Sequence, residues 1–145
     1  MLESRLTEAV VSLGRKIHHT LGPGFDRDAY LNALAIEFTE SRFRHERNRT
    51  LDVLYRRRIV GAYRADFVIQ DRVLVLVRNS SALTPADDVH LINRVAATGT
   101  ESGVLLNFGT PELEVRVHRI GEKARETENA PPALQDRTQT PARVP

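Results

Sequence analysis

The sequence contains no cysteine and no long apolar run, and each absence narrows the class of protein. Without cysteine the chain can form neither a disulfide framework nor a thiolate metal site, which argues against a stapled secreted scaffold. No apolar run approaches the length of a membrane-spanning helix, and the N-terminal segment intersperses charges with apolar residues, unlike a secretory signal. We therefore expect a cytoplasmic protein with no membrane partner.

The length and charge distribution of the chain indicate one small domain with an uneven surface. With 145 residues, of which 41% are hydrophobic and 28% charged, the chain is long enough for one hydrophobic core. The formal net charge is only +2, but arginines are concentrated in the middle of the chain, whereas the segment 121–145 is balanced. This asymmetry favours an anionic partner or an electrostatic interface.

Three helices are predicted from apolar spacing and from the residues at helix ends. Residues 2–21 carry apolar side chains at steps of three or four, and this pattern stops at the Gly-Pro-Gly segment 22–24. Asp26 can cap a second helix. A third helix is expected to begin after Thr84, which is followed by proline and then by an acid at the third position, and to end near Gly99.

The remaining segments have strand patterns. Residues 45–69 alternate apolar and polar side chains around an arginine-rich turn, which predicts a hairpin. Residues 73–77 are continuously apolar, as in a central strand covered on both faces. Segments 104–108 and 113–117 supply two further strands. The predicted order, ααβββαββ, describes a compact α/β layer domain.

We expect this domain to span residues 1–120. The segment 121–145 contains prolines, scattered charges and almost no large apolar residue. It is expected to be a flexible C-terminal tail, either disordered or ordered only by a neighbouring subunit.

Several short motifs occur in a characteristic order along the chain. They are Leu21-Gly22-Pro23-Gly24-Phe25, Tyr30, Ala33-Leu34-Ala35-Ile36-Glu37, Tyr63-Arg64-Ala65-Asp66, Ala82-Leu83-Thr84-Pro85, Thr98-Gly99 and Leu105-Leu106-Asn107-Phe108-Gly109. Together they resemble the GxxExxY family of PD-(D/E)XK nuclease-like proteins over roughly residues 5–120. The resemblance implies a restriction-endonuclease-like α/β fold and Mg²⁺-assisted phosphodiester hydrolysis.

The positions that would bind the metal are nevertheless changed. By the resemblance, the glutamate that names the family falls on Arg27, the second acidic ligand on Leu76 and the lysine on Arg78, while Asp66 keeps the first aspartate. Magnesium requires oxygen ligands, usually carboxylates, to activate water and to offset charge on the phosphate. A guanidinium is also a fixed, always charged fork rather than a mobile ammonium. We therefore predict a catalytically inactive homologue with no bound metal and no small-molecule cofactor.

The family's glutamine and tyrosine on the following helix fall, by the resemblance, on His90 and Arg94. If these side chains converge with Arg27 and Arg78, the former catalytic pocket is cationic. We expect Asp66 to pair with one of these two arginines as a structural ion pair, since a buried arginine needs a partner. The alternatives are an anion-binding pocket and an exposed arrangement of these residues.

The arginine-rich hairpin is the clearest basic feature outside this pocket. The candidates for contact with an anion or a nucleic acid are Arg47, Arg49, Arg56, Arg57 and Arg58. Few aromatic residues lie near them, unlike in a platform that stacks single-stranded bases. The turn can therefore be a solvated hairpin tip, a nucleic-acid contact or a protein interface.

The leading functional interpretation is a non-enzymatic protein derived from a nuclease and retained for self-assembly as a homo-oligomer, or for binding. The alternative is a nucleic-acid-binding protein that uses the basic hairpin and the cationic former active site. A third interpretation is a residual Mg²⁺-dependent nuclease with rearranged ligands. A salt-sensitive complex with nucleic acid would favour the second, and metal-dependent cleavage would favour the third.

Overall fold

The computed structural model describes residues 2–120, which form three helices and five strands. The helices are α1 (Leu2–Leu21), α2 (Arg27–Glu40) and α3 (Pro85–Thr98), and the strands are β1 (His45–Tyr55), β2 (Arg58–Ile69), β3 (Val73–Arg78), β4 (Ser102–Asn107) and β5 (Glu114–Arg119). The predicted order ααβββαββ is confirmed. The tail expected at 121–145 lies outside the described residues, and no helix among those described is long and apolar enough to cross a membrane.

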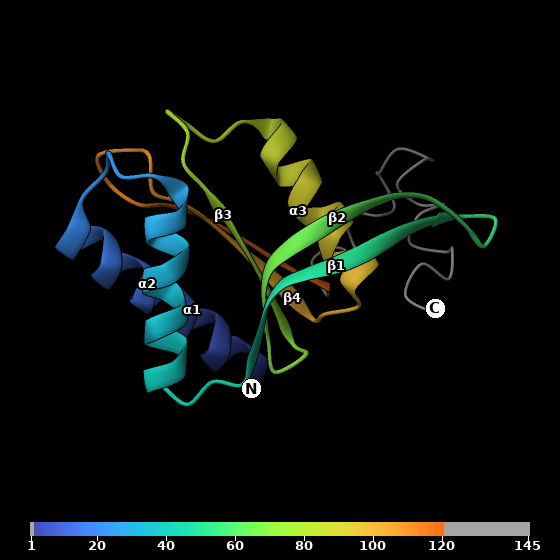
Figure 1. The fold of residues 1–145 in the computed structure, drawn as a ribbon, viewed down its shortest axis with the longest axis horizontal. Coiled ribbons are helices and arrows are strands. Elements are labelled where there is room, and N and C mark those ends of the chain that lie inside the picture. Colours follow the sequence, from blue (N-terminus) through green and yellow to red (C-terminus); the bar gives the residue numbers. More distant parts are fainter. Residues whose placement is uncertain (1, 121–145) are drawn as a thin grey trace.

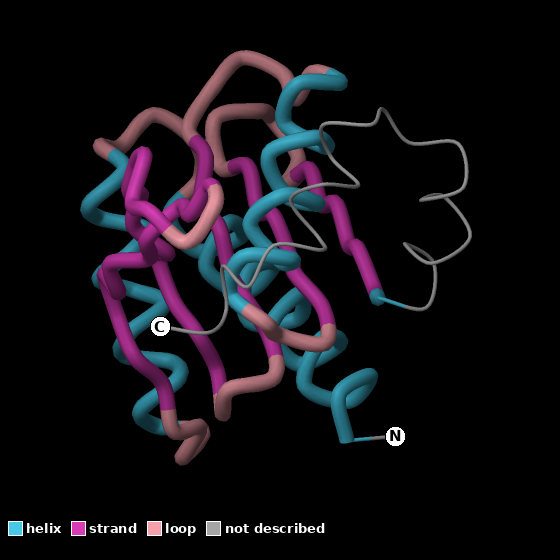
Figure 2. Tube along the Cα trace, turned by 90° about the vertical axis from the view of Figure 1, so that its right-hand side faces the viewer, coloured by secondary structure: helices cyan, strands magenta, loops and turns pink. Residues whose placement is uncertain are grey.

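The strands form one mixed sheet in the order β1-β2-β3-β4-β5. Neighbouring strands are antiparallel except β3 and β4, which are parallel and are joined by α3. A parallel pair needs such a crossover because its strands start at the same edge of the sheet. Figure 2 shows the strands side by side in a twisted sheet with helices packed against it.

The central strand β3 separates two apolar layers, because successive side chains of a strand point to opposite faces. Val73, Val75 and Val77 pack in the layer that contains α1 and α2. Leu74 and Leu76 pack in the other layer, against α3. The continuous apolar run in the sequence therefore results from burial on both faces of the sheet.

The helix ends agree with the predicted signals for α3 but not fully for α2. The carboxylate of Asp87 accepts a hydrogen bond from the backbone N–H of Thr84 at 2.8 Å, which closes the first turn of α3. Gly99 ends this helix in the left-handed conformation, with φ of 79°. Asp26 occupies the N-cap position of α2, but its side chain makes no capping hydrogen bond.

The hairpin of β1 and β2 extends well beyond the rest of the sheet (Figure 1). β1 and β2 are paired over most of their length, from His45 opposite Ile69 to Tyr55 opposite Arg58, with a register shift between Val53 and Leu54. By contrast, β2 pairs with β3 only through the three residues 67–69. The turn end of the hairpin therefore projects as an arm, and a gap in strand pairing opens between β2 and β3 immediately before Phe67.

Candidate functional site

Asp66 lies at the point where β2 parts from β3. The last paired residues of these strands are Phe67 and Val75, so no backbone bond of β2 reaches the far end of β3. The Asp66 side chain takes that place, because its Oδ2 accepts a hydrogen bond from the Val77 N–H at 2.8 Å. The carboxylate therefore acts as a strand partner for β3.

Arg27, the first residue of α2, reaches the same place from the helical layer. Its Nη2 forms an ion pair with Asp66 Oδ1, and its Nε donates to the Val77 carbonyl at 3.0 Å. The Asp66 side chain is 12% exposed and that of Arg27 is 42% exposed. Together the two side chains satisfy both polar backbone groups of Val77. The expected pairing of Asp66 with an arginine is confirmed, and the partner is Arg27.

Arg78 is engaged with a different carboxylate. Its Nε lies 3.3 Å from Asp87 Oδ1, at the start of α3. Burial raises the pKa of Asp87, but the hydrogen bonds from the Thr84 N–H and from Arg78 outweigh it and hold that pKa below its ordinary value. The ion pair between Arg78 and Asp87 thus links the end of β3 to the beginning of α3.

Leu76, the position where the resemblance places a second acidic ligand, is buried in the apolar layer under α3. It packs in one cluster with Leu91, Val95 and Leu105. A carboxylate at this position would have to enter that cluster or displace its neighbours. The side chain present here supports the core and offers no ligand.

The residues around Asp66 do not fit a magnesium ion. Asp66 is held by Arg27 and Asp87 by Arg78, so both of these carboxylates already have a cationic partner. Within residues 2–120, no group of three or more histidine, cysteine, aspartate or glutamate side chains is placed to hold a metal. A divalent cation would also be repelled by the two guanidinium groups.

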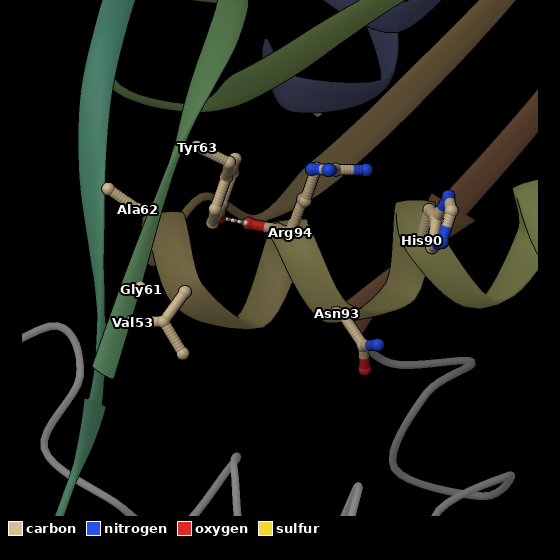
Figure 3. Close-up of a pocket in the computed structure, with 7 residues that line it drawn as sticks. All are labelled: Val53, Gly61, Ala62, Tyr63, His90, Asn93 and Arg94. Carbon is tan, nitrogen blue, oxygen red and sulfur yellow. Dashed lines mark hydrogen bonds between the residues drawn. The ribbon is translucent and has the colours of Figure 1, made fainter. Parts of the chain in front are cut away.

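His90 and Arg94 line a separate hollow of about 260 Å³ between α3 and the hairpin (Figure 3). The Tyr63 hydroxyl donates to the Arg94 carbonyl at 3.3 Å, and the Arg94 guanidinium lies 4.7 Å from the centre of the Tyr63 ring. The lining of this hollow includes none of Arg27, Asp66, Leu76 and Arg78. Of the six positions carried over from the resemblance, this hollow therefore brings together His90 and Arg94.

The five arginines proposed for anion contact also fall into two groups. Near the base of the hairpin, Arg47 lies 5.8 Å from the centre of the Phe67 ring, and Arg49 pairs with Glu46 at 3.2 Å. The other three, Arg56, Arg57 and Arg58, are exposed at the turn. This turn presents three consecutive exposed arginines to a partner.

The apolar neighbours of these three arginines were not anticipated from the sequence. Tyr55, Ile59 and Val60 are among the most exposed large hydrophobic residues of the described chain. Successive side chains of a regular strand point to opposite faces of the sheet. In this hairpin the register shifts, because Leu54 pairs with Ile59 and Val53 pairs with Gly61. Val60 is therefore left without an opposite residue, which makes it a β-bulge. The clustering of these side chains depends on that bulge.

A buried polar network near the opposite end of the sheet was also missed. The side-chain oxygen of Asn107 accepts from the Ser80 and Gly109 N–H groups, at 3.0 and 3.1 Å, and its amide donates to Glu114 at 2.9 Å. The bond from Asn107, followed by one from the Leu83 N–H, lowers the pKa of Glu114. The network ties the loop before α3 to β4 and β5, and its partners come from segments too distant in sequence for spacing to reveal.

The layers and the position of Asp66 define the chain as a nuclease-like α/β layer protein. In residues 2–120, three helices surround a mixed sheet of five strands, and the acidic residue lies where two central strands part. A family model described as the PD-(D/E)XK nuclease superfamily matches residues 4–120. The chain belongs to this superfamily. Comparisons with the curated proteins and with the solved structures found no match.

Proposed function

We propose that this chain is a non-enzymatic member of the superfamily, of the GxxExxY kind, retained for self-assembly. The observation that carries the proposal is the engagement of Asp66, the one metal-binding residue that the motif retains. Its two carboxylate oxygens are bound to the Arg27 guanidinium and to the Val77 N–H. A metal at Asp66 would have to displace Arg27, which would also remove the hydrogen bond of Arg27 to the Val77 carbonyl.

The other substituted positions support the same proposal. Leu76 contributes to the core and Arg78 binds Asp87, so each has a structural contact in place of a catalytic one. Removing one partner of a largely buried ion pair leaves the other charge unsatisfied, which is strongly unfavourable. Rearranging these contacts to admit Mg²⁺ would therefore cost stability at several points at once.

Self-assembly is supported by the surface of the projecting hairpin. Its end exposes Tyr55, Ile59 and Val60 next to three arginines. Aromatic residues and arginine are enriched in protein interfaces, and a projecting arm can reach a neighbouring molecule without rearranging the core. Within residues 2–120, β5 also forms one edge of the sheet, and an edge strand can pair with a strand of another molecule.

A second candidate function is nucleic-acid binding, favoured by the same three arginines. If each neutralises one phosphate, the logarithm of the binding constant should fall with the logarithm of salt concentration with a slope of about −2.7. This binding would be independent of sequence, because phosphate contacts carry no base information.

The native mass of the purified protein, measured by light scattering together with the ratio of absorbance at 260 and 280 nm, tests both functions. A defined oligomer with the absorbance ratio of pure protein supports self-assembly, whereas a small particle that carries nucleic acid supports the second candidate. A monomer free of nucleic acid would reject both.

A cleavage assay tests the remaining interpretation, a residual nuclease. The protein is incubated with single-stranded and double-stranded DNA and RNA in the presence of Mg²⁺ or Mn²⁺. We expect no cleavage. Metal-dependent cleavage that the Asp66→Ala variant abolishes would overturn the proposal that the chain is non-enzymatic.

A further inference from the structure

The end of the hairpin combines apolar and basic side chains in one small surface. We call residues 55–60 the hairpin tip. Ile59 and Val60 are 65% and 63% exposed, although they are neighbours in one strand. The bulge at Val60 leaves it without a partner on β1, and such irregularities redirect side chains. Two adjacent aliphatic residues exposed beside three arginines have no role in the core of this molecule.

The turn residues of the tip also have a backbone conformation that is unfavourable for arginine. Arg56 and Arg57 form the two-residue turn between β1 and β2, and both have positive φ, 51° and 65°. This turn favours asparagine and glycine, because other residues are strained in the left-handed region. The arginines are therefore placed at the tip against the local conformational preference, as expected of residues that contact a partner.

The chemistry of the tip fits an apolar and acidic protein surface better than a nucleic acid. Phosphate binding would engage the arginines but would leave the side chains of Ile59 and Val60 exposed to solvent. The face of Tyr55, which could stack on a base, is approached by Arg56, whose guanidinium lies 5.6 Å from the ring centre. The partner expected from these contacts has an aliphatic patch with a carboxylate beside it.

The outer face of α2 in this same chain has that chemistry. Ile36 is 58% exposed and, together with Ala35, Thr39 and Glu40, borders a shallow hollow of about 280 Å³. Glu40 is exposed, and the last turn of α2 contains no basic residue to offset it or the negative end of the helix dipole. Glu40 is the acidic residue of this face, and the exposed Arg42 follows the helix.

The hairpin tip lies at one end of the long axis of the molecule, and α2 lies in the opposite half (Figure 1). A contact between them therefore joins two copies head to tail, and each joined copy keeps one unused tip or one unused α2 face. Contacts of this kind repeat until a ring closes, or continue as a filament.

We propose that the hairpin tip of one copy docks on the outer face of α2 of the next copy, with Ile59 and Val60 against Ile36 and the tip arginines near Glu40. The proposal rests on the proposed function, since it specifies how the chain assembles. It differs from a symmetric contact between two tips, which would stop at a dimer.

Two single variants test this contact, because each introduces a charge into one of the two surfaces. Val60→Asp places a negative charge in the tip, facing Glu40, and Ile36→Lys places a positive charge on α2, facing the tip arginines. Both positions are exposed, so circular dichroism and melting temperature should match those of the wild type. Val89→Asp, at a 49% exposed residue of α3, is the matched control.

We expect each variant alone to lose the oligomer and to scatter as a monomer, while Val89→Asp keeps the wild-type mass. Mixing the two variants in equal amounts should restore a contact between the intact tip of Ile36→Lys and the intact α2 of Val60→Asp. The mixture should therefore reach at least twice the mass of the chain, because at the other pair of surfaces the carboxylate introduced at position 60 faces the ammonium introduced at position 36.

The other outcomes overturn the proposal in distinguishable ways. Loss of the oligomer in Val60→Asp but not in Ile36→Lys would indicate a contact between two tips. An oligomer kept in both variants would place the interface elsewhere, without contradicting the proposal that the chain assembles. Growth in mass only after addition of a single-stranded oligonucleotide would assign the tip to nucleic acid. A wild-type monomer at every concentration would reject self-assembly and the docking contact together.

Discussion

At the scale of single residues, Asp66 combines two structural contacts that can be tested by removing it. The Asp66→Ala variant leaves the Val77 N–H without an acceptor and Arg27 without its counter-ion. Because the carboxylate is largely buried but Arg27 is partly exposed, we expect a loss of about 2–3 kcal/mol in the free energy of unfolding. Urea denaturation followed by circular dichroism measures this loss.

Glu101→Ala provides the control for Asp66→Ala. Glu101 also contacts an arginine, Arg72 at 2.7 Å, but its side chain is 50% exposed. Exposed ion pairs contribute little, so its removal should cost less than about 1 kcal/mol. Equal stabilities of the Asp66→Ala variant and the wild type would show that the pair with Arg27 does not support the fold.

Asp87 gives a prediction for the dependence of stability on pH. Its pKa is lowered in the folded protein, so the folded state favours the ionised carboxylate more than the unfolded chain does. The resulting stabilisation is complete above the unfolded pKa of about 3.9 and is lost as the pH falls through the lower folded pKa. The wild type should therefore be more stable than Asp87→Asn at neutral pH, and the difference should shrink in acid.

Thermal melting of both proteins between about pH 2.5 and pH 7 measures this difference. Asp88→Asn, which removes a charge from the same helix end, is the control for a general effect of charge. A gap between wild type and Asp87→Asn that stays constant down to the lowest pH would contradict the assignment of the pKa shift to Thr84 and Arg78.

At the scale of elements, the turn of the hairpin can be made more stable than it is. Replacing Arg56 and Arg57 by asparagine and glycine relieves the two positive φ angles, which should raise the free energy of unfolding by about 1–2 kcal/mol. Differential scanning calorimetry should show a higher melting temperature. If Arg57 is not strained, the double variant will melt at or below the wild-type temperature.

Arg58→Gly is the control for this turn, because Arg58 begins β2 and is not among the residues with positive φ. Glycine at this position relieves no backbone strain and loses more conformational entropy on folding than arginine does. This variant should therefore be slightly destabilised. The asparagine and glycine variant should also assemble less well if the tip arginines contact a neighbouring copy. A gain in stability together with a loss of assembly would separate folding from binding at this turn.

The elements differ in how far the sequence predicts them. The start of α3 was predictable because Thr84, Pro85 and Asp87 act within one helical turn. The burial of β3 on both faces of the sheet was predictable from its uninterrupted run of valine and leucine. A strand with apolar side chains on both faces is typical of a sheet that is covered on both sides. Which of the two expected arginines pairs with Asp66 was not predictable, since Arg27 reaches it only through the packing of α2 on the sheet.

The position of the hollow that His90 and Arg94 border has the same cause. Their spacing correctly places both on one face of α3, where they border the same hollow. Where that face points depends on the angle between α3 and the hairpin, which no local pattern encodes. The bulge that exposes Val60 is likewise a property of the pairing between two strands, so the tip could be recognised as basic but not as apolar.

At the scale of the whole molecule, the fold is stabilised by contacts that do not depend on a metal. Both apolar layers are closed around the sheet, and the position of the second acidic ligand is itself part of one layer. The gap between β2 and β3, where a metal would need carboxylates, is bridged by the pair of Arg27 and Asp66. The frame therefore has its stabilising contacts in place, and under the proposed function these contacts stand where a metal site would be.

This arrangement predicts that magnesium leaves the stability of the whole protein unchanged. A ligand that binds only the folded state raises its stability by about 2.7 kcal/mol at one hundred times its dissociation constant. With Asp66 and Asp87 already bound to arginines, we expect no change in melting temperature when Mg²⁺ or Mn²⁺ is added or when a chelator is present. Sodium chloride at matched ionic strength controls for screening of the surface charges. A saturable rise in melting temperature with Mg²⁺, absent in Asp66→Ala, would demonstrate a metal site and return the chain to the hydrolytic members of its superfamily.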